Sequence, residues 1–160
     1  MKSNLEISRF RERLTENVVV GNPQFIGTPF SALLMLIQEN RLFYGEHTDS
    51  TFEFTWRKLF RPVSFVIKGT FKAQDSITVL IYEFKAISLI YWVQRIIPFG
   101  FFFLINIMFF IESEPVASFV ILNAVSVVMY CLILSYDYLE RKNLEKEFCR
   151  IFEIQKDSAS

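Results

Sequence analysis

The chain is poor in the residues that metal binding, disulfide formation and phosphate binding require. Its 160 residues include a single histidine, His47, which excludes a metal cluster built from several histidines. Cys131 and Cys149 lack metal-ligand spacing, and because Cys131 falls in an apolar run a structural disulfide is not expected. The five glycines stand singly, so no glycine-rich loop can cradle a phosphate. The sequence therefore predicts no metal site, no cofactor and no enzymatic activity.

An excess of charge of one sign is also missing, since 17 Lys and Arg residues balance 17 Asp and Glu residues. Domains that bind nucleic acid usually carry a clear basic surplus, so nucleic acid is not expected as a partner. His47 lies in the polar segment 45–50, whose composition is that of a hairpin turn. A solvated turn histidine is favoured over a catalytic one.

Two apolar runs in the second half of the chain carry no charged residue. They are Ile96–Ile111 and Val116–Tyr136, separated only by the acidic segment 112–115. A bilayer core about 30 Å thick requires roughly 20 residues in a helix, which the second run supplies alone. The first run is shorter, and it extends upstream to residue 86 across Gln94 and Arg95. The pattern predicts a transmembrane helical hairpin over residues 86–136, with the lipid bilayer as a partner.

The charges that flank the hairpin predict its orientation. The acidic connection contains no Lys or Arg, whereas basic residues precede the first run and follow the second: Lys85, Arg95, Arg141, Lys142, Lys146 and Arg150. The positive-inside rule then predicts that both termini of a two-pass protein lie in the cytoplasm.

Three polar residues interrupt the predicted spans. Arg95 lies near the cytoplasmic end of the first span, and we expect it to snorkel to the headgroups rather than to mark a functional site. Asn106 and Asn123 lie deep in opposite spans, at a level that suits an interhelical hydrogen bond. Such a bond would hold the hairpin together rather than line a pore.

The first 85 residues are predicted to form one small cytoplasmic α+β domain. Leu5–Asn17 has the apolar spacing of a short amphipathic helix, while the run Phe30–Ile37 is too short to assign. Alternation with period two over 51–57 and 65–72, followed by an apolar segment at 77–84, predicts an antiparallel meander of about four strands.

After the second span, residues 137–155 contain no Pro or Gly, so the helix is expected to continue into the cytoplasm. Leu144, Phe148, Ile151 and Phe152 form one apolar stripe, and residues 137–160 are predicted to be an amphipathic helix and tail. The stripe needs a partner, and either the β-domain or a second copy of the protein would serve.

The order of these segments resembles a group of uncharacterised small bacterial membrane proteins. The residues that carry the resemblance are the segments 13–17, 43–46, 51–54 and 66–71, followed by the closing two-helix hairpin. The resemblance implies an architecture and a location, namely a cytoplasmic β-rich domain followed by a transmembrane hairpin in the bacterial inner membrane. It implies no activity.

One cluster of cations and aromatic residues is a candidate lipid or ligand patch: Trp56, Arg57, Lys58, Phe60 and Arg61. Near the inner leaflet, such a patch could engage anionic headgroups or a phosphorylated ligand. The alternative is that the aromatic residues belong to the core while the cations are solvated.

These features leave two hypotheses for the function. The first is a non-catalytic, membrane-anchored interaction module whose β-domain binds a protein partner or anionic lipid. The second is a membrane-disrupting effector, in which the β-domain senses a ligand and the hairpins oligomerise, similar in architecture to antiphage effectors that join a small β-barrel to two membrane helices.

Overall fold

The computed structural model describes residues 1–23, 41–57, 64–86, 88–112 and 116–155. The chain divides into two compact units. The first contains Met1–Ile87 together with Arg141–Ser160, and the second contains Ser88–Glu140. The first unit is therefore discontinuous in sequence, because the second unit is inserted between its two segments.

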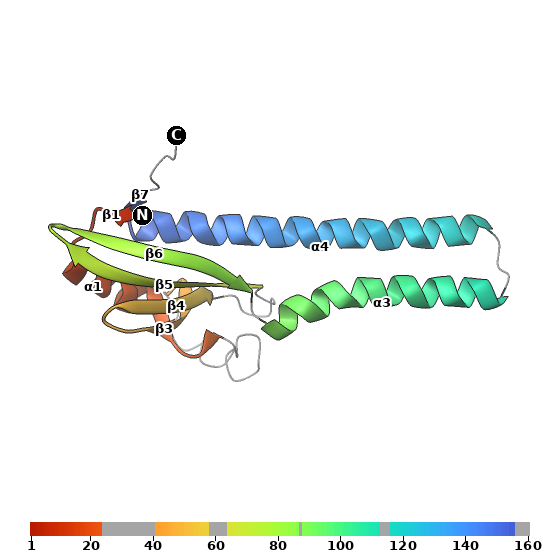
Figure 1. Cartoon of the computed structure of the whole chain (residues 1–160), viewed down its shortest axis with the longest axis horizontal. Coiled ribbons are helices and arrows are strands. Elements are labelled where there is room, and N and C mark those ends of the chain that lie inside the picture. Colours follow the sequence, from red (N-terminus) through yellow and green to blue (C-terminus); the bar gives the residue numbers. More distant parts are fainter. Residues whose placement is uncertain (24–40, 58–63, 87, 113–115, 156–160) are drawn as a thin grey trace. The chain divides into compact units, whose positions relative to one another are not determined.

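A mixed sheet of seven strands forms the frame of the first unit (Figure 1). Its spatial order is β2-β3-β4-β5-β6-β1-β7, and β2 pairs parallel with β3 while all other neighbours are antiparallel. The strands are β1 (Lys2–Ser3), β2 (Val18–Val20), β3 (Phe43–His47), β4 (Thr51–Trp56), β5 (Phe65–Gln74), β6 (Ile77–Ala86) and β7 (Ile154–Gln155).

The predicted α+β class is confirmed, and the sheet is larger than the meander expected from the sequence. The meander corresponds to β3, β4, β5 and β6, which follow one another in sequence and in space. The turn between β5 and β6 is Asp75–Ser76, where Asp75 has a φ of 54°, a conformation that Asp tolerates better than most residues. The additional strands β1, β2 and β7 have only two or three residues each.

Helix α1 (Ile7–Asn17) begins two residues after its predicted start at Leu5 and ends at its predicted last residue, where three valines follow. Valine is stiff at χ1 and favours extended backbone, so the chain enters β2 directly at Val18. Phe10 and Leu14, on the predicted apolar face of α1, are fully buried. The run Phe30–Ile37 lies outside the described residues.

The core of the first unit is rich in phenylalanine and lies on one face of the sheet. The rings of Phe10 and Phe152 are 4.9 Å apart, and Phe148 lies 5.4 Å from Phe52 and 5.0 Å from Tyr82. Phe148 and Phe152 belong to the end of α4 and the residue after it. The apolar stripe predicted after the second span thus completes the core of the β-domain, which answers the question of its partner.

The second unit consists of α3 (Ser88–Glu112) and most of α4 (Val116–Ile151). The two helices pack antiparallel, since the rings of Phe99 and Tyr130 lie 5.0 Å apart and those of Phe109 and Phe119 lie 5.7 Å apart. Within the described residues, one helical segment, Phe119–Ile151, is long and apolar enough to cross a membrane. The apolar segment of α3, Arg95–Ile111, is shorter.

Candidate functional site

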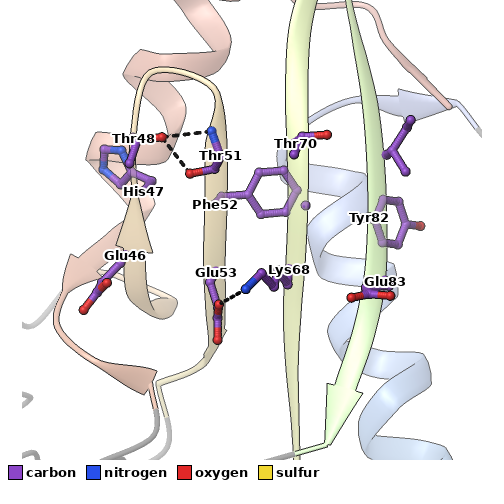
Figure 2. A pocket seen from close by; sticks show the side chains of 12 residues that line it. Glu46, His47, Thr48, Thr51, Phe52, Glu53, Lys68, Thr70, Tyr82 and Glu83 are labelled. Atoms are coloured by element: carbon purple, nitrogen blue, oxygen red, sulfur yellow. Dashed lines mark hydrogen bonds and ion pairs between the residues drawn. The ribbon is translucent and has the colours of Figure 1, made fainter.

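A pocket of about 480 Å³ lies on the sheet of the first unit, across β3, β4, β5 and β6 (Figure 2). Most of the residues that line it have polar side chains, although apolar atoms make up the larger part of its surface. They come from neighbouring positions on the four strands and the β3–β4 turn: Glu46, His47, Thr48, Thr51, Phe52, Glu53, Lys68, Gly69, Thr70, Ile81, Tyr82 and Glu83. The strand register decides which of these side chains share a face.

Four charged side chains form one cross-strand row in this pocket. Glu46 lies opposite Glu53, Glu53 opposite Lys68, and Lys68 opposite Glu83. Directly opposed residues of antiparallel strands point to the same face, so the row lies on the face opposite the phenylalanine core. Figure 2 shows the four side chains in this order from β3 to β6.

Only one ion pair neutralises charge within the row. Nζ of Lys68 lies 3.1 Å from Oε2 of Glu53, while Glu46 and Glu83 form no ion pair with any residue that the structure describes. The direct opposition of Glu46 and Glu53 is unfavourable, because like charges that face each other across a sheet repel. The row has three carboxylates and one ammonium group, so it is acidic.

A second polar row borders the charged one. The hydroxyls of Thr48 and Thr51 are 2.6 Å apart at the β3–β4 turn, and Thr51 faces Thr70 across β4 and β5. Ile81, beside Thr70, is 74% exposed although it is apolar. The pocket therefore offers carboxylates, hydroxyls and one exposed aliphatic side chain to a ligand.

A third row lies between the charged row and the hydroxyl row. Its side chains are directed toward the core and form the floor of the pocket. This row consists of His47, Phe52, Gly69 and Tyr82, which lie opposite one another in the register. The Tyr82 hydroxyl donates a hydrogen bond to Oε1 of Glu145 at 3.1 Å. Burial, with the neighbouring Cys149 and Glu145, raises the pKa of the Tyr82 phenol, so this group remains a donor at physiological pH.

His47 is the last residue of β3 and lines the pocket. Its partial burial, together with the positive charge of Arg41, lowers the pKa of the imidazole below its ordinary value. His47 is therefore neutral at pH 7 and does not offset the acidic row. The arrangement provides no nucleophile paired with a base in this pocket.

The lipid or ligand patch predicted from the sequence is described only in part. The Trp56 ring lies 5.8 Å from the buried Phe43 ring, and Nη1 of Arg57 donates to the backbone oxygen of Arg41 at 3.1 Å. Trp56 thus packs on the core, while Arg57 is half-buried and bonded to the backbone rather than fully solvated. Lys58, Phe60 and Arg61 lie outside the described residues, so the patch remains a prediction.

The structure brings together the two asparagines of the predicted hairpin. Nδ2 of Asn106 donates to Oδ1 of Asn123 at 2.9 Å, and Nδ2 of Asn123 donates back at 3.4 Å. Each amide also donates to a backbone oxygen of its own helix, that of Phe102 or Phe119. The two amides thus bond to each other within a single hairpin.

Arg95 has a partner on the second helix. Nη2 of Arg95 donates to Oδ2 of Asp137 on α4 at 3.2 Å, and its expected position at the headgroups stays a prediction. Sequence reasoning considered Arg95 alone and missed Asp137. The available signal was an opposite charge directly after the second apolar run, at a level of the hairpin that matches Arg95.

Comparisons of the chain with protein-family models, curated proteins and solved structures find no match.

Sequence reasoning missed the charged row, although part of its signal was visible. The alternation in 51–57 and 65–72 placed Glu53 and Lys68 on the polar faces of their strands. Glu46 and Glu83 join them only once the register is known, and alternation alone does not specify register. Charged residues at polar positions of successive strands were the available indication of a common row.

Proposed function

We propose that the protein is a non-catalytic, membrane-anchored interaction module. In this proposal, α3 and α4 cross the bacterial inner membrane as a hairpin, both termini are cytoplasmic, and the first unit binds a protein partner through the pocket on its sheet. The proposal makes the hairpin an anchor and the α+β unit the functional part.

The observation that carries the proposal is the apolar surface around the second unit. Large apolar side chains are exposed on both helices and around most of their circumference, including Phe103 and Leu104 on α3 and Val120, Val128 and Leu132 on α4. A continuous apolar surface of this extent makes a water-soluble protein prone to aggregation, whereas lipid chains solvate it. A membrane environment is therefore the simplest surrounding for this unit.

The polar residues of the second unit support the same environment. Asn106 and Asn123 are turned toward each other, and the Asp137 side chain is 6% exposed against Arg95. Polar side chains in membrane helices usually face a neighbouring helix, where they find partners that lipid cannot supply. The hairpin thus has its polar groups inside and its apolar groups outside.

The charges of the pocket favour a protein with a basic surface over an anionic lipid as its partner. The row of Glu46, Glu53 and Glu83 repels phosphate groups, and the positive charge of Lys68 is already paired with Glu53. An exposed aliphatic residue beside charged groups, as at Ile81, is common where proteins meet. In the same proposal, the segment 56–61 would contact anionic lipid headgroups.

The effector hypothesis is less favoured by the contacts of the hairpin. An effector of that kind would need groups that bind neighbouring hairpins, and the two amides were the candidates. Asn106 and Asn123 satisfy each other within one chain, so they require no second copy.

The first test of the proposal is the membrane topology of the full chain. Reporters are fused to the chain in a bacterium. After Ser160, green fluorescent protein should fluoresce and alkaline phosphatase should be inactive. After Glu114, in the connection between the helices, alkaline phosphatase should be active. Membranes washed at alkaline pH should retain the untagged protein. Phosphatase activity after Ser160, or release of the protein by the wash, would contradict the proposal.

A further inference from the structure

The Arg95–Asp137 ion pair lies in an unexpected place along the hairpin. Nη2 of Arg95 and Oδ2 of Asp137 are 3.2 Å apart, and the Asp137 side chain is 6% exposed. Ion pairs at the surface of a protein are usually solvated, and their partners are seldom buried to this degree. The carboxylate is therefore buried beside its cationic partner rather than exposed at the surface.

Exposed apolar residues continue past the pair on both helices. On α3, Trp92 and Val93 precede Arg95 and are 57% and 44% exposed. On α4, Tyr138 and Leu139 follow Asp137 and are 64% and 54% exposed. The apolar outer surface of the hairpin thus extends beyond the level of the ion pair instead of ending there.

The lengths of the helices give an independent reason to place the pair inside the apolar surface. Ile96–Ile111 has 16 residues, about 24 Å of helix, which is shorter than a hydrocarbon core of about 30 Å. If Arg95 and Asp137 count as one neutral pair, the runs 88–111 and 116–139 each have 24 residues. Two equal runs of about 36 Å can cross a bilayer with some tilt.

We propose that the Arg95–Asp137 pair is embedded within the membrane and that it allows α3 and α4 to insert together as one hairpin. This inference rests on the proposed function, because it presupposes that the hairpin crosses the membrane. Each charge alone would be costly in lipid, whereas the two neutralise each other between the helices. The next charged residues outward, Lys85 and Glu140, then mark the cytoplasmic boundary of the spans.

Cysteine accessibility measures this boundary directly. In the full chain with Cys131→Ser and Cys149→Ser, single variants Trp92→Cys and Leu139→Cys are prepared in inverted membranes and treated with a water-soluble maleimide. Both positions should lose labelling in the membrane and regain it after denaturation in detergent. The matched control is Asn143→Cys, an exposed position beyond the boundary, which should label in intact membranes. Labelling at residues 92 and 139 as fast as at residue 143 would overturn the proposal.

Charge exchange tests whether the pair is needed for insertion. Arg95→Asp and Asp137→Arg should each lose most of the protein from the alkaline-resistant membrane fraction, because each leaves two like charges between the helices. The double variant with both exchanges should restore that fraction, and Arg95→Leu with Asp137→Leu should preserve it. Single variants that insert as well as the wild type would contradict a role of the pair in insertion.

The outcomes separate this inference from the proposed function. If the wild-type protein is itself released by the alkaline wash, the membrane anchor fails and the inference fails with it. If the wild type is retained while residues 92 and 139 label freely, the anchor stands and the ion pair lies at the headgroups.

Discussion

At the scale of single residues, Gly69 is a position in the pocket where a side chain has no room. A Cβ atom there would lie 2.6 Å from both the backbone oxygen of Ile81 and Cζ of Phe52, and 2.9 Å from Cβ of Tyr82. A backbone oxygen in a paired strand cannot move aside cheaply. We expect Gly69→Ala to lower the free energy of unfolding by about 1–3 kcal/mol, as overpacking of a core commonly does.

Denaturant unfolding of the detergent-solubilised protein measures this loss. Thr70→Ala is the matched control, because Thr70 is exposed on the opposite face of the same strand and should change the free energy by less than about 0.5 kcal/mol. Equal stability of the two variants would mean that the strands can separate enough to admit a methyl group.

The faces of the long strands could be predicted at this scale, but their register could not. Alternation placed Phe52, Phe54 and Phe71 on one side, and all three are buried. The acidic row depends on which residue of one strand meets which of the next, a relation that the turns and the core establish together. A local pattern therefore identified the core residues and missed the pocket.

At the scale of elements, the contact between Asn106 and Asn123 should stabilise the packing of α3 against α4. Hydrogen bonds between membrane helices contribute roughly 0.6 kcal/mol on average and seldom more than about 1.7 kcal/mol. A double-mutant cycle of Asn106→Leu and Asn123→Leu, measured by unfolding in bicelles, should give a coupling energy in this range.

Ser126→Ala is the control for the cycle, since the Ser126 hydroxyl donates to the backbone oxygen of Leu122 in its own helix. This variant should show no coupling with Asn106→Leu. A coupling near zero for the two asparagines would indicate that water or lipid groups replace the interhelical bond at little cost.

Elements were predictable in proportion to their length. Apolar runs of 16 and 21 residues predicted α3 and α4, and the alternation of apolar and polar residues predicted β4 and β5. The strands β1, β2 and β7 have two or three residues, too few to display any period. They pair because the longer strands beside them have unpaired backbone N–H and C=O groups at the edge of the sheet. A short stretch of sequence does not show which strand edge it will meet.

At the scale of the whole molecule, the first unit is completed only after the second has been made. Its core needs Phe148 and Phe152, which follow the second unit in sequence, and β7 pairs with β1 at the edge of the sheet. Arg13 on α1 also donates to the backbone oxygen of Ile151 at 2.8 Å. The first 87 residues alone therefore lack one wall of their core, and folding of the sheet should await synthesis of the hairpin.

A chain of residues 1–87 should accordingly fail to fold, whereas residues 1–87 joined to 141–160 by a flexible linker should unfold cooperatively. The expected difference follows from the aromatic rings that the missing segment supplies, since loss of even one buried Phe costs about 3–5 kcal/mol. Thermal unfolding, measured by circular dichroism, distinguishes the two chains. In the linked chain, Phe148→Ala should lower the unfolding temperature, whereas the control Lys146→Ala should not, which would attribute the effect to the core. A cooperative transition for residues 1–87 alone would show that the sheet folds without α4, and the coupling between domain folding and hairpin synthesis would then be lost.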